Sequence, residues 1–243
     1  MGVYNFFSLG NLVVLSSWSR GDWLVVKVGD ESQIWPSAQQ IKADRGAIRF
    51  LCHTFAIGSK MDRNRLKIAF VDRDGTINVD RGFVYRIEDW EFTPSACQGL
   101  AILCQAGFQI AVVTNQSGIA SGLYTRDDAE RLHAFMRQQL AEAGIRVDSV
   151  VYCPHAPEAI CDCRKPQIGM ARIVEAELGM PIDYAASWTI GDKLSDIDFG
   201  KSLGTKTSLI RSQYWNDGDV ASDADLIVDS LFEAAQRITA DYP

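Results

Sequence analysis

The sequence lacks the run of about 18 apolar residues that a transmembrane helix requires. Its N-terminus has only a short apolar stretch, without a basic segment before it or an A-x-A cleavage site, so we do not interpret it as a signal peptide. An excess of positive charge is also missing, because the formal net charge is −7. We therefore expect a cytoplasmic monomer that binds neither nucleic acid nor a membrane.

Cysteine is too unevenly placed for a disulfide framework. Of the six cysteines, Cys153, Cys161 and Cys163 lie within one short segment that also contains His155. Three thiolates and one imidazole with the spacing C-x-H-x5-C-x-C can complete a tetrahedral Zn²⁺ site, and a site with no open position is structural. We predict such a site in a reducing compartment, with reduced surface cysteines or a disulfide as the alternatives.

From Leu66 onward, short apolar strands alternate regularly with helical segments. The expected strands cover residues 66–71, 108–113, 147–152, 187–190, 207–210 and 225–228. This alternation predicts an α/β fold of three layers, Rossmann-like, in which a parallel sheet carries helices on both faces. The intervals between these elements are too short for a large cap domain.

The helices are predicted from their end signals. Thr93 is the expected N-cap of a helix that Pro94 opens and that stops at Gly107. Thr125 and Asp128 resemble a capping box. The helix that follows presents one apolar face and ends at Gly144, and a further helix covers residues 169–178. The expected members of that apolar face are Ala129, Leu132, Met136, Leu140 and Ala143, while His133 is expected to be solvated.

Residues 1–60 show no comparable order, although 23–28 resembles a strand and 47–58 resembles a strand or a buried helical turn. Met61 stands directly before the first clear strand. We therefore expect a catalytic domain over residues 61–243 and hypothesise that residues 1–60 are a dispensable extension, translated upstream of a gene that starts at Met61.

Chemistry-bearing residues follow the strand ends, where ligands bind in sheets of this kind. Asp72 and Asp74 follow the first strand, Thr114 follows the second, and Asp192 follows the fourth. Lys165 precedes the 169–178 helix. Because these strand ends meet at one edge of the sheet, we expect these side chains to share a site.

Together these residues suit phosphoryl transfer, which needs a nucleophile, a proton donor and positive charge around the phosphoryl group. One carboxylate of the Asp72–Asp74 pair can attack phosphorus, and the other can act as general acid and then as base. A hard cation held by oxygen ligands relieves the repulsion between carboxylates and phosphate, which favours Mg²⁺ with Asp192 as a further ligand. Lys165 adds fixed positive charge.

The segments DRDGTIN (72–78), TNQSG (114–118), RKP (164–166) and GDKLSD (191–196) resemble the haloacid dehalogenase-like phosphatases. The resemblance extends over residues 66–235 and is closest to the histidinol-phosphate and heptose-bisphosphate branch. It implies that Asp72 is the nucleophile and Asp74 the general acid and base. It further implies that Asp72, the Asp74 carbonyl and Asp192 hold Mg²⁺, while Asp196 either supports the site or is a solvated helix residue. The residues that this resemblance places at the phosphoryl group or beside it are Thr114, Asn115, Gln116, Ser117, Lys165 and Lys193.

The same resemblance extends to the cysteine-histidine segment, although the interval between His155 and Cys161 is shorter than in bacterial members. A clamped loop would direct Arg164 and Lys165 toward the phosphate. In the related enzymes, the loop that matches Asp80, Arg81, Gly82 and Phe83 contacts the sugar.

The favoured substrate is D-glycero-D-manno-heptose 1,7-bisphosphate, with release of the 7-phosphate on the route to a nucleotide-activated heptose and Arg164 on the distal phosphate. Histidinol phosphate is the main enzymatic alternative. A phospho-accepting or zinc-loop binding module is the non-enzymatic one, but the second carboxylate, Asp74, favours turnover.

Overall fold

The computed structural model describes residues 4–9, 12–17, 23–27, 65–212 and 223–240. The chain divides into two compact units, Met1–Lys60 and Met61–Pro243. In the first, β1 (Tyr4–Leu9), β2 (Leu12–Ser17) and β3 (Trp23–Lys27) form an antiparallel sheet in that order. The strand predicted at 23–28 is confirmed, whereas β1 and β2 were not predicted. Their signal is the Gly10-Asn11 pair between two apolar runs, which is typical of a tight hairpin. The segment 47–58 lies outside the described residues.

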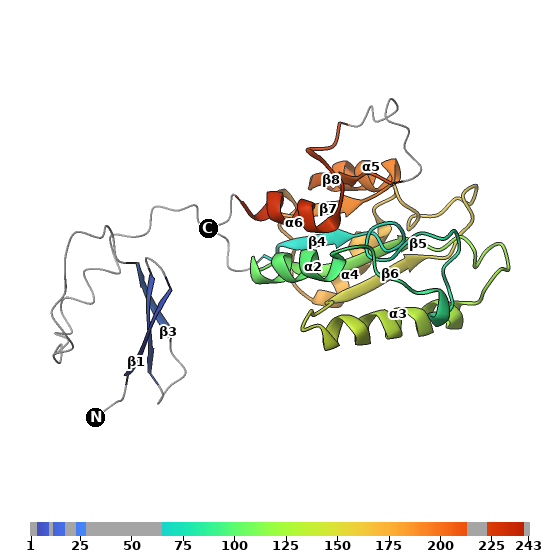
Figure 1. Ribbon diagram of the computed structural model, residues 1–243. Coiled ribbons are helices and arrows are strands. Elements are labelled where there is room, and N and C mark those ends of the chain that lie inside the picture. The colour runs from blue at the N-terminus through green and yellow to red at the C-terminus, as the bar shows by residue number, and fades with distance from the viewer. Residues whose placement is uncertain (1–3, 10–11, 18–22, 28–64, 213–222, 241–243) are drawn as a thin grey trace. The chain divides into compact units, whose positions relative to one another are not determined.

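The second unit is built on a six-stranded sheet with the order β6-β5-β4-β7-β8-β9, in which every neighbouring pair is parallel (Figure 1). Each strand was predicted to within two residues at both ends. The observed bounds are β4 (Ile68–Val71), β5 (Gln109–Asn115), β6 (Ser149–Cys153), β7 (Trp188–Gly191), β8 (Lys206–Ile210) and β9 (Leu226–Val228).

Helices cover both faces of this sheet, which confirms the predicted three-layer α/β class (Figure 1). They are α2 (Ala96–Gln105), α3 (Arg126–Glu142), α4 (Gly169–Leu178), α5 (Leu194–Leu203) and α6 (Leu231–Thr239). Side chains from α2, α3 and α6 share one core, and those from α4 and α5 share the other. Two short 3-10 helices, η1 (Ile87–Asp89) and η2 (Tyr184–Ala186), lie in loops.

The central strand β4 shows how a short sequence serves two cores. Its side chains alternate between faces, so that Ala69 and Val71 pack on the α2 side while Ile68 and Phe70 pack on the α4 side. All four residues are buried, as expected for a parallel strand with a helix layer on each face.

Two end signals were misread. The N-cap of α2 is Ser95, in the left-handed conformation with φ 62°, and not Thr93. The Thr93 hydroxyl instead donates to the Thr76 carbonyl at 2.7 Å, where it ties this loop to the chain beyond β4. The capping box of Thr125 and Asp128 at α3 is confirmed, but Ala143 is an exposed C-cap residue and does not belong to the apolar face.

Between β4 and α2 the described chain contains loops, isolated bridges and η1. No helix among the described residues is long and apolar enough to cross a membrane.

Candidate active site

The candidate site lies at the carboxyl end of β4. This strand pairs with β5 on one side and β7 on the other. The strands that follow it are therefore added first on one side of β4 and then on the other, so the strand order reverses here. Such a reversal separates the loops that follow neighbouring strands and leaves a crevice between them. The loops after β4, β5 and β7 carry Asp72, Thr114 and Asp192, and the structure brings these three together as the strand ends predict.

Asp72 is buried and paired with a lysine from a distant part of the chain. The Lys165 Nζ donates to Asp72 Oδ1 at 2.7 Å and to the Val113 carbonyl at 2.7 Å, and it lies 2.6 Å from Asp196 Oδ1. All three ammonium hydrogens therefore have an acceptor. Burial would raise the pKa of Asp72, but the charges of Lys165 and Lys193 outweigh it and hold that pKa below its usual value. Asp72 is thus kept as a carboxylate.

Asp192 is the third acidic residue of this edge and is wholly buried. Oxygens of Asp72, Asp192 and Asp196 lie within 4.8 Å of one another. Burial, followed by the nearby Asp72 charge, raises the pKa of Asp192 to about 8. A divalent cation would relieve this repulsion, and a set of carboxylate oxygens suits Mg²⁺. The donor set therefore fits the predicted ion.

Gly75 allows Asp192 to lie against the loop after β4. A Cβ at Gly75 would lie 2.2 Å from Asp192 Oδ2, and Gly75 has φ +87°, which L-residues seldom adopt. Asp196 is less available as a ligand, because its Oδ1 pairs with Lys165 and its Oδ2 accepts from the Lys193 backbone N–H at 3.0 Å. The solvated alternative for Asp196 is wrong, since this side chain is 1% exposed.

Asp74 lies two residues from Asp72 in different surroundings. Its carboxylate accepts hydrogen bonds from Arg73 Nη2 at 2.9 and 2.8 Å, from Asn78 Nδ2 at 3.0 Å and from Gln116 Nε2 at 2.9 Å. We call Arg73, Asn78 and Gln116 the Asp74 cage. Sequence reasoning missed Arg73 and Asn78, because an arginine or asparagine in a turn after a strand is ordinarily solvated, whereas both are fully buried here.

The segment after β5 supports the site from the other side. The Thr114 hydroxyl accepts from Gln116 Nε2 at 2.9 Å. Asn115 exchanges two hydrogen bonds with the Lys165 backbone, at 3.0 and 3.3 Å. This exchange fixes the loop that delivers the Lys165 ammonium group to Asp72.

A cavity of about 290 Å³ opens over these side chains. Its lining includes most of the predicted site residues, namely Asp72, Asp74, Asp80, Gly82, Phe83, Thr114, Asn115, Gln116, Ser117, Arg164, Lys165 and Lys193. Arg81 and Asp192 are not among them, because Arg81 pairs with Glu91 in an exposed position and Asp192 is wholly buried. Tyr124 and Ser195 also line the cavity and were not predicted, although Ser195 lies within the GDKLSD segment.

Lys193 connects the loop after β7 to the predicted sugar loop. Its Nζ lies 3.2 Å from Asp80 Oδ2 and 3.5 Å from the Asp74 carbonyl oxygen. Burial would lower the pKa of Lys193, but the charges of Asp72, Asp192 and Asp80 raise it above its usual value. The cavity therefore keeps a second fixed cation beside Lys165.

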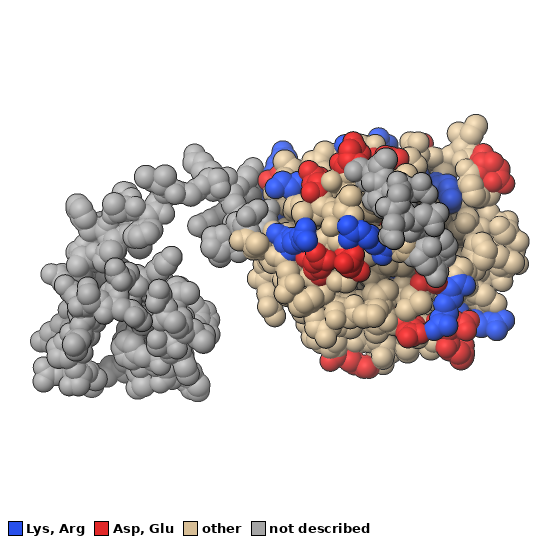
Figure 2. Space-filling view, turned by 45° about the horizontal axis from the view of Figure 1, so that its top comes forward, with Lys and Arg blue, Asp and Glu red and all other residues tan. Residues whose placement is uncertain are grey.

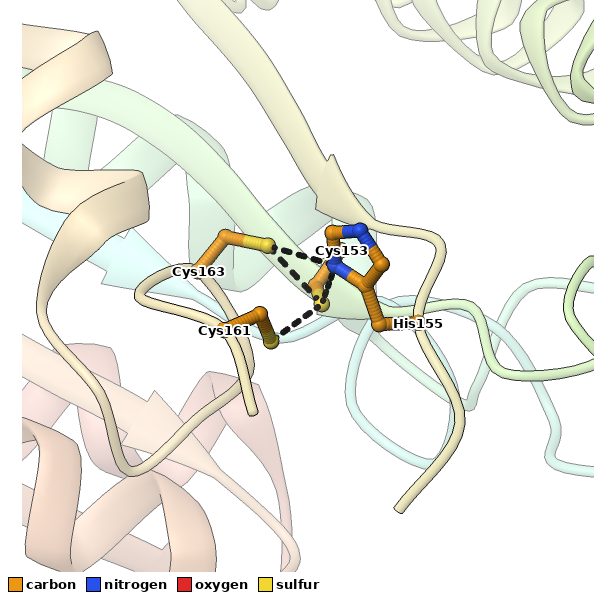
Figure 3. A group of neighbouring side chains, drawn as sticks. All are labelled: Cys153, His155, Cys161 and Cys163. Carbon is orange, nitrogen blue, oxygen red and sulfur yellow. Dashed lines mark hydrogen bonds between the residues drawn. The ribbon is translucent and has the colours of Figure 1, made fainter. Parts of the chain in front are cut away.

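The cysteine-histidine segment forms a compact cluster beside this cavity (Figure 3). Ligands about 2.0–2.3 Å from a central tetrahedral ion are roughly 3.4–3.8 Å apart. The distances from Cys153 Sγ to His155 Nδ1 and to Cys161 Sγ, 3.5 and 3.8 Å, have this spacing, while those from Cys163 Sγ to Cys153 Sγ and His155 Nδ1 are shorter, 3.0 and 3.1 Å. All three cysteines are free thiols, so these residues could hold Zn²⁺.

The cluster is joined directly to the cations of the cavity. Arg164 and Lys165 follow Cys163, and Arg164 Nη1 donates to the His155 carbonyl at 3.3 Å. On the face shown in Figure 2, acidic and basic side chains lie beside one another. The cations that line the cavity are Arg164, Lys165 and Lys193, which its loops place there.

The family described as polynucleotide kinase 3 phosphatase matches residues 67–221. D-glycero-beta-D-manno-heptose-1,7-bisphosphate 7-phosphatase of Photorhabdus laumondii is 38% identical over 178 residues, which cover 70% of this chain and 93% of the relative. The enzyme of the same name from Escherichia coli K12 is 39% identical, with 70% and 92% covered.

Among solved structures, the chain is similar to D,D-heptose 1,7-bisphosphate phosphatase from B. bronchiseptica, complexed with magnesium and phosphate. The TM-score is 0.64 and the identity 30%, with 71% of this chain and 98% of that chain covered. The prediction of a phosphoric monoester hydrolase is confirmed by these relatives.

Proposed function

The chain belongs to the haloacid dehalogenase-like heptose-bisphosphate phosphatases, and from this premise we propose that it removes the 7-phosphate of D-glycero-D-manno-heptose 1,7-bisphosphate. The observation that carries the proposal is the meeting of Asp72, Asp74 and Lys165 in one cavity at the reversal point of the sheet. The names of the relatives favour the β anomer and the heptose over histidinol phosphate.

In the first step, an Asp72 carboxylate oxygen attacks phosphorus and the bond from phosphorus to the sugar oxygen breaks. Lys165 holds Asp72 Oδ1 and neutralises charge next to the transferring group. Asp74 acts as the general acid of this step and gives a proton to the departing sugar oxygen. The products are the sugar alcohol and an aspartyl-phosphate on Asp72.

In the second step, water attacks the phosphorus of the aspartyl-phosphate. Asp74, now a carboxylate, takes a proton from this water, and the Asp72–phosphorus bond breaks to free inorganic phosphate. Both catalytic carboxylates return to their starting states. The two steps therefore give the two carboxylates different roles: Asp72 is the nucleophile, and Asp74 is first the acid and then the base.

Mg²⁺ would be held by Asp72, Asp192 and the backbone carbonyl of Asp74. When bound, it would neutralise the negative charge of phosphate oxygens and carboxylates. Zn²⁺ held by Cys153, His155, Cys161 and Cys163 would be structural, because the four side chains fill a tetrahedral site.

The rest of the substrate would lie toward Asp80, Gly82 and Phe83, with Arg164 at the distal phosphate. All of them line the cavity, and Phe83 is 50% exposed at its mouth. The exposed position of Arg81 removes it from our list of substrate contacts.

We also propose that residues 61–243 hold the whole activity, as a cytoplasmic monomer acting on a small phosphorylated sugar. Every described residue of the cavity lies in the Met61–Pro243 unit, and the free thiols suit a reducing compartment. A protein of residues 61–243 that folded but lost activity would contradict this assignment.

The test is a comparison of kcat/KM for the full chain with Mg²⁺ on the α and β heptose 1,7-bisphosphates and on histidinol phosphate. We expect the β anomer to give the higher kcat/KM. The expected product is heptose 1-phosphate, identified by ³¹P NMR. A higher kcat/KM for histidinol phosphate, or removal of the phosphate group at C1 instead of C7, would overturn the proposed substrate. The phosphatase chemistry would stay in place.

A further inference from the structure

Arg73 is a fully buried cation that the reaction steps above do not use. Its side chain is 1% exposed and pairs with Asp74 at 2.8 Å. Besides the two Asp74 oxygens, Nη2 reaches the Val84 carbonyl at 2.7 Å and Gln116 Oε1 at 3.3 Å. A guanidinium is rigid and planar, so wherever Arg73 is held, the Asp74 carboxylate is held as well.

The other terminal nitrogen of Arg73 is held by a histidine from a helix. Arg73 Nη1 lies 2.9 Å from His133 Nε2. His133 is 5% exposed on α3, so the expectation of a solvated side chain is wrong. Since a guanidinium can only donate, His133 Nε2 is the acceptor and the ring proton is on Nδ1.

The protonation of His133 agrees with this role. Burial, then the charges of Arg73 and Arg137, lower the pKa of His133 to about 3. The imidazole is therefore neutral at any pH at which the enzyme would be assayed, and its acceptor lone pair is always present. His133 does not line the cavity, so it acts on the site only through Arg73.

We infer that His133 is a positioning residue for Asp74: by accepting from Arg73, it fixes the guanidinium that aims the Asp74 carboxylate. The inference rests on the proposed function, in which Asp74 moves the proton. Without an acceptor at this position, Arg73 Nη1 would be buried without a partner, and the guanidinium would turn toward another. A displacement of about 1 Å at a catalytic group can reduce a rate on the order of 100-fold.

The experiment compares His133→Leu, which removes the acceptor, with His133→Gln, which places an amide oxygen near the position of Nε2. Each variant is assayed on ribose 5-phosphate, whose alkoxide leaving group needs a proton, and on p-nitrophenyl phosphate, whose leaving group does not. The parameter is kcat/KM, because it reports the steps up to the first irreversible one, transfer of phosphorus to Asp72.

For His133→Leu we expect kcat/KM to fall roughly 10- to 100-fold on ribose 5-phosphate and no more than about threefold on p-nitrophenyl phosphate. His133→Gln should recover most of the lost activity. The matched control is Leu140→Ala, at a buried position two turns further along α3. It should lower the melting temperature without changing the ratio of the kcat/KM values on the two substrates.

An equal loss on both substrates, no loss on either, or a His133→Gln variant as impaired as His133→Leu would overturn the inference. Asp72→Asn and Asp74→Asn, measured alongside, separate this failure from failure of the proposed function. If Asp74→Asn retained full activity, the proposed function would fall first; if both were impaired and His133→Leu were not, only the role of His133 would fall.

Discussion

Asp72 and Asp74 leave the same strand end two residues apart, yet they face two differently built regions. Asp72 lies among charges, with Lys165 bonded to it and Asp192 and Asp196 close by. Asp74 lies in a cage of fixed hydrogen-bond donors, one of which is the Arg73 cation, and this cation is backed by a neutral histidine. The comparison teaches that surroundings, and not residue type, divide the work between two identical side chains.

The division matches the two roles in the proposed reaction. A nucleophile must stay ionised next to an incoming phosphate, and the lysines lower the pKa of Asp72 accordingly. A proton carrier must instead be aimed at successive oxygens, which needs geometry more than charge. The predictions below test whether the two regions can be damaged separately.

The largest effect is expected at Asp72. Asp72→Asn removes the nucleophile while it keeps an acceptor near Lys165, so kcat/KM should fall on the order of 10⁴-fold or more on every substrate, alkyl or aryl. No phosphorylated protein should be detectable by mass spectrometry after acid quench. Turnover within tenfold of the wild type would remove the covalent step from the mechanism.

Asp74→Asn is expected to give a smaller and differently shaped loss. General acid and base catalysis is worth roughly 10²- to 10⁴-fold, so kcat on a sugar phosphate should fall within that range. Because the base for hydrolysis is lost while the nucleophile remains, aspartyl-phosphate should accumulate, and most clearly with p-nitrophenyl phosphate. The same pattern in Asp72→Asn and Asp74→Asn would erase the distinction between the two regions.

The sequence predicted the Asp72 region well, because its parts are local. A carboxylate directly after an apolar strand, or a lysine two residues after a cysteine pair, has its place set by the nearest element end. The parallel sheet then brings these ends together. Arg81 was harder to place from the sequence, because the direction of its side chain depends on an ion pair with Glu91 and not on the strand.

The Asp74 region was harder to predict, because its members meet only in three dimensions. Arg73 is next to Asp74 in sequence, but its burial depends on α3 closing over it. A signal for His133 was present: it lies four residues after Ala129 and three before Met136, which places it on the buried face of α3. The prediction of a solvated His133 rested on its polar side chain. Its position on the apolar face of α3 indicated burial and was the better guide.

The zinc cluster should affect the Asp72 region alone. In a Cys161→Ser/Cys163→Ser protein shown by atomic absorption to lack zinc, the loop that carries Arg164 and Lys165 is less firmly held. We expect KM to rise on the order of tenfold and the melting temperature to fall. The ratio of kcat/KM on an alkyl phosphate to kcat/KM on an aryl phosphate should not change. Unchanged kinetics in the zinc-free protein would contradict a link between the cluster and the phosphate.

The smallest expected effect concerns stability, and it isolates the Asp74 region. A pKa of about 3 for His133 in the folded chain, against about 6.5 unfolded, means that only the unfolded chain takes up this proton between those values. Its contribution is thus present in full above pH 6.5 and is lost as the pH falls toward 3. The groups around the ring are Arg73, Arg137 and Tyr152, and the two arginines oppose protonation.

His133→Gln has no such proton to bind, so its stability should fall less on acidification. Between pH 7.5 and pH 5, the wild type should lose about 2 kcal/mol more than the variant, or roughly 4–8 °C of melting temperature. All other titrating groups are shared, so the difference between the two pH dependences reports His133 alone. Parallel pH dependences for the two proteins would mean that the pKa of His133 is not lowered in the folded chain, which would contradict a ring buried against Arg73 and Arg137.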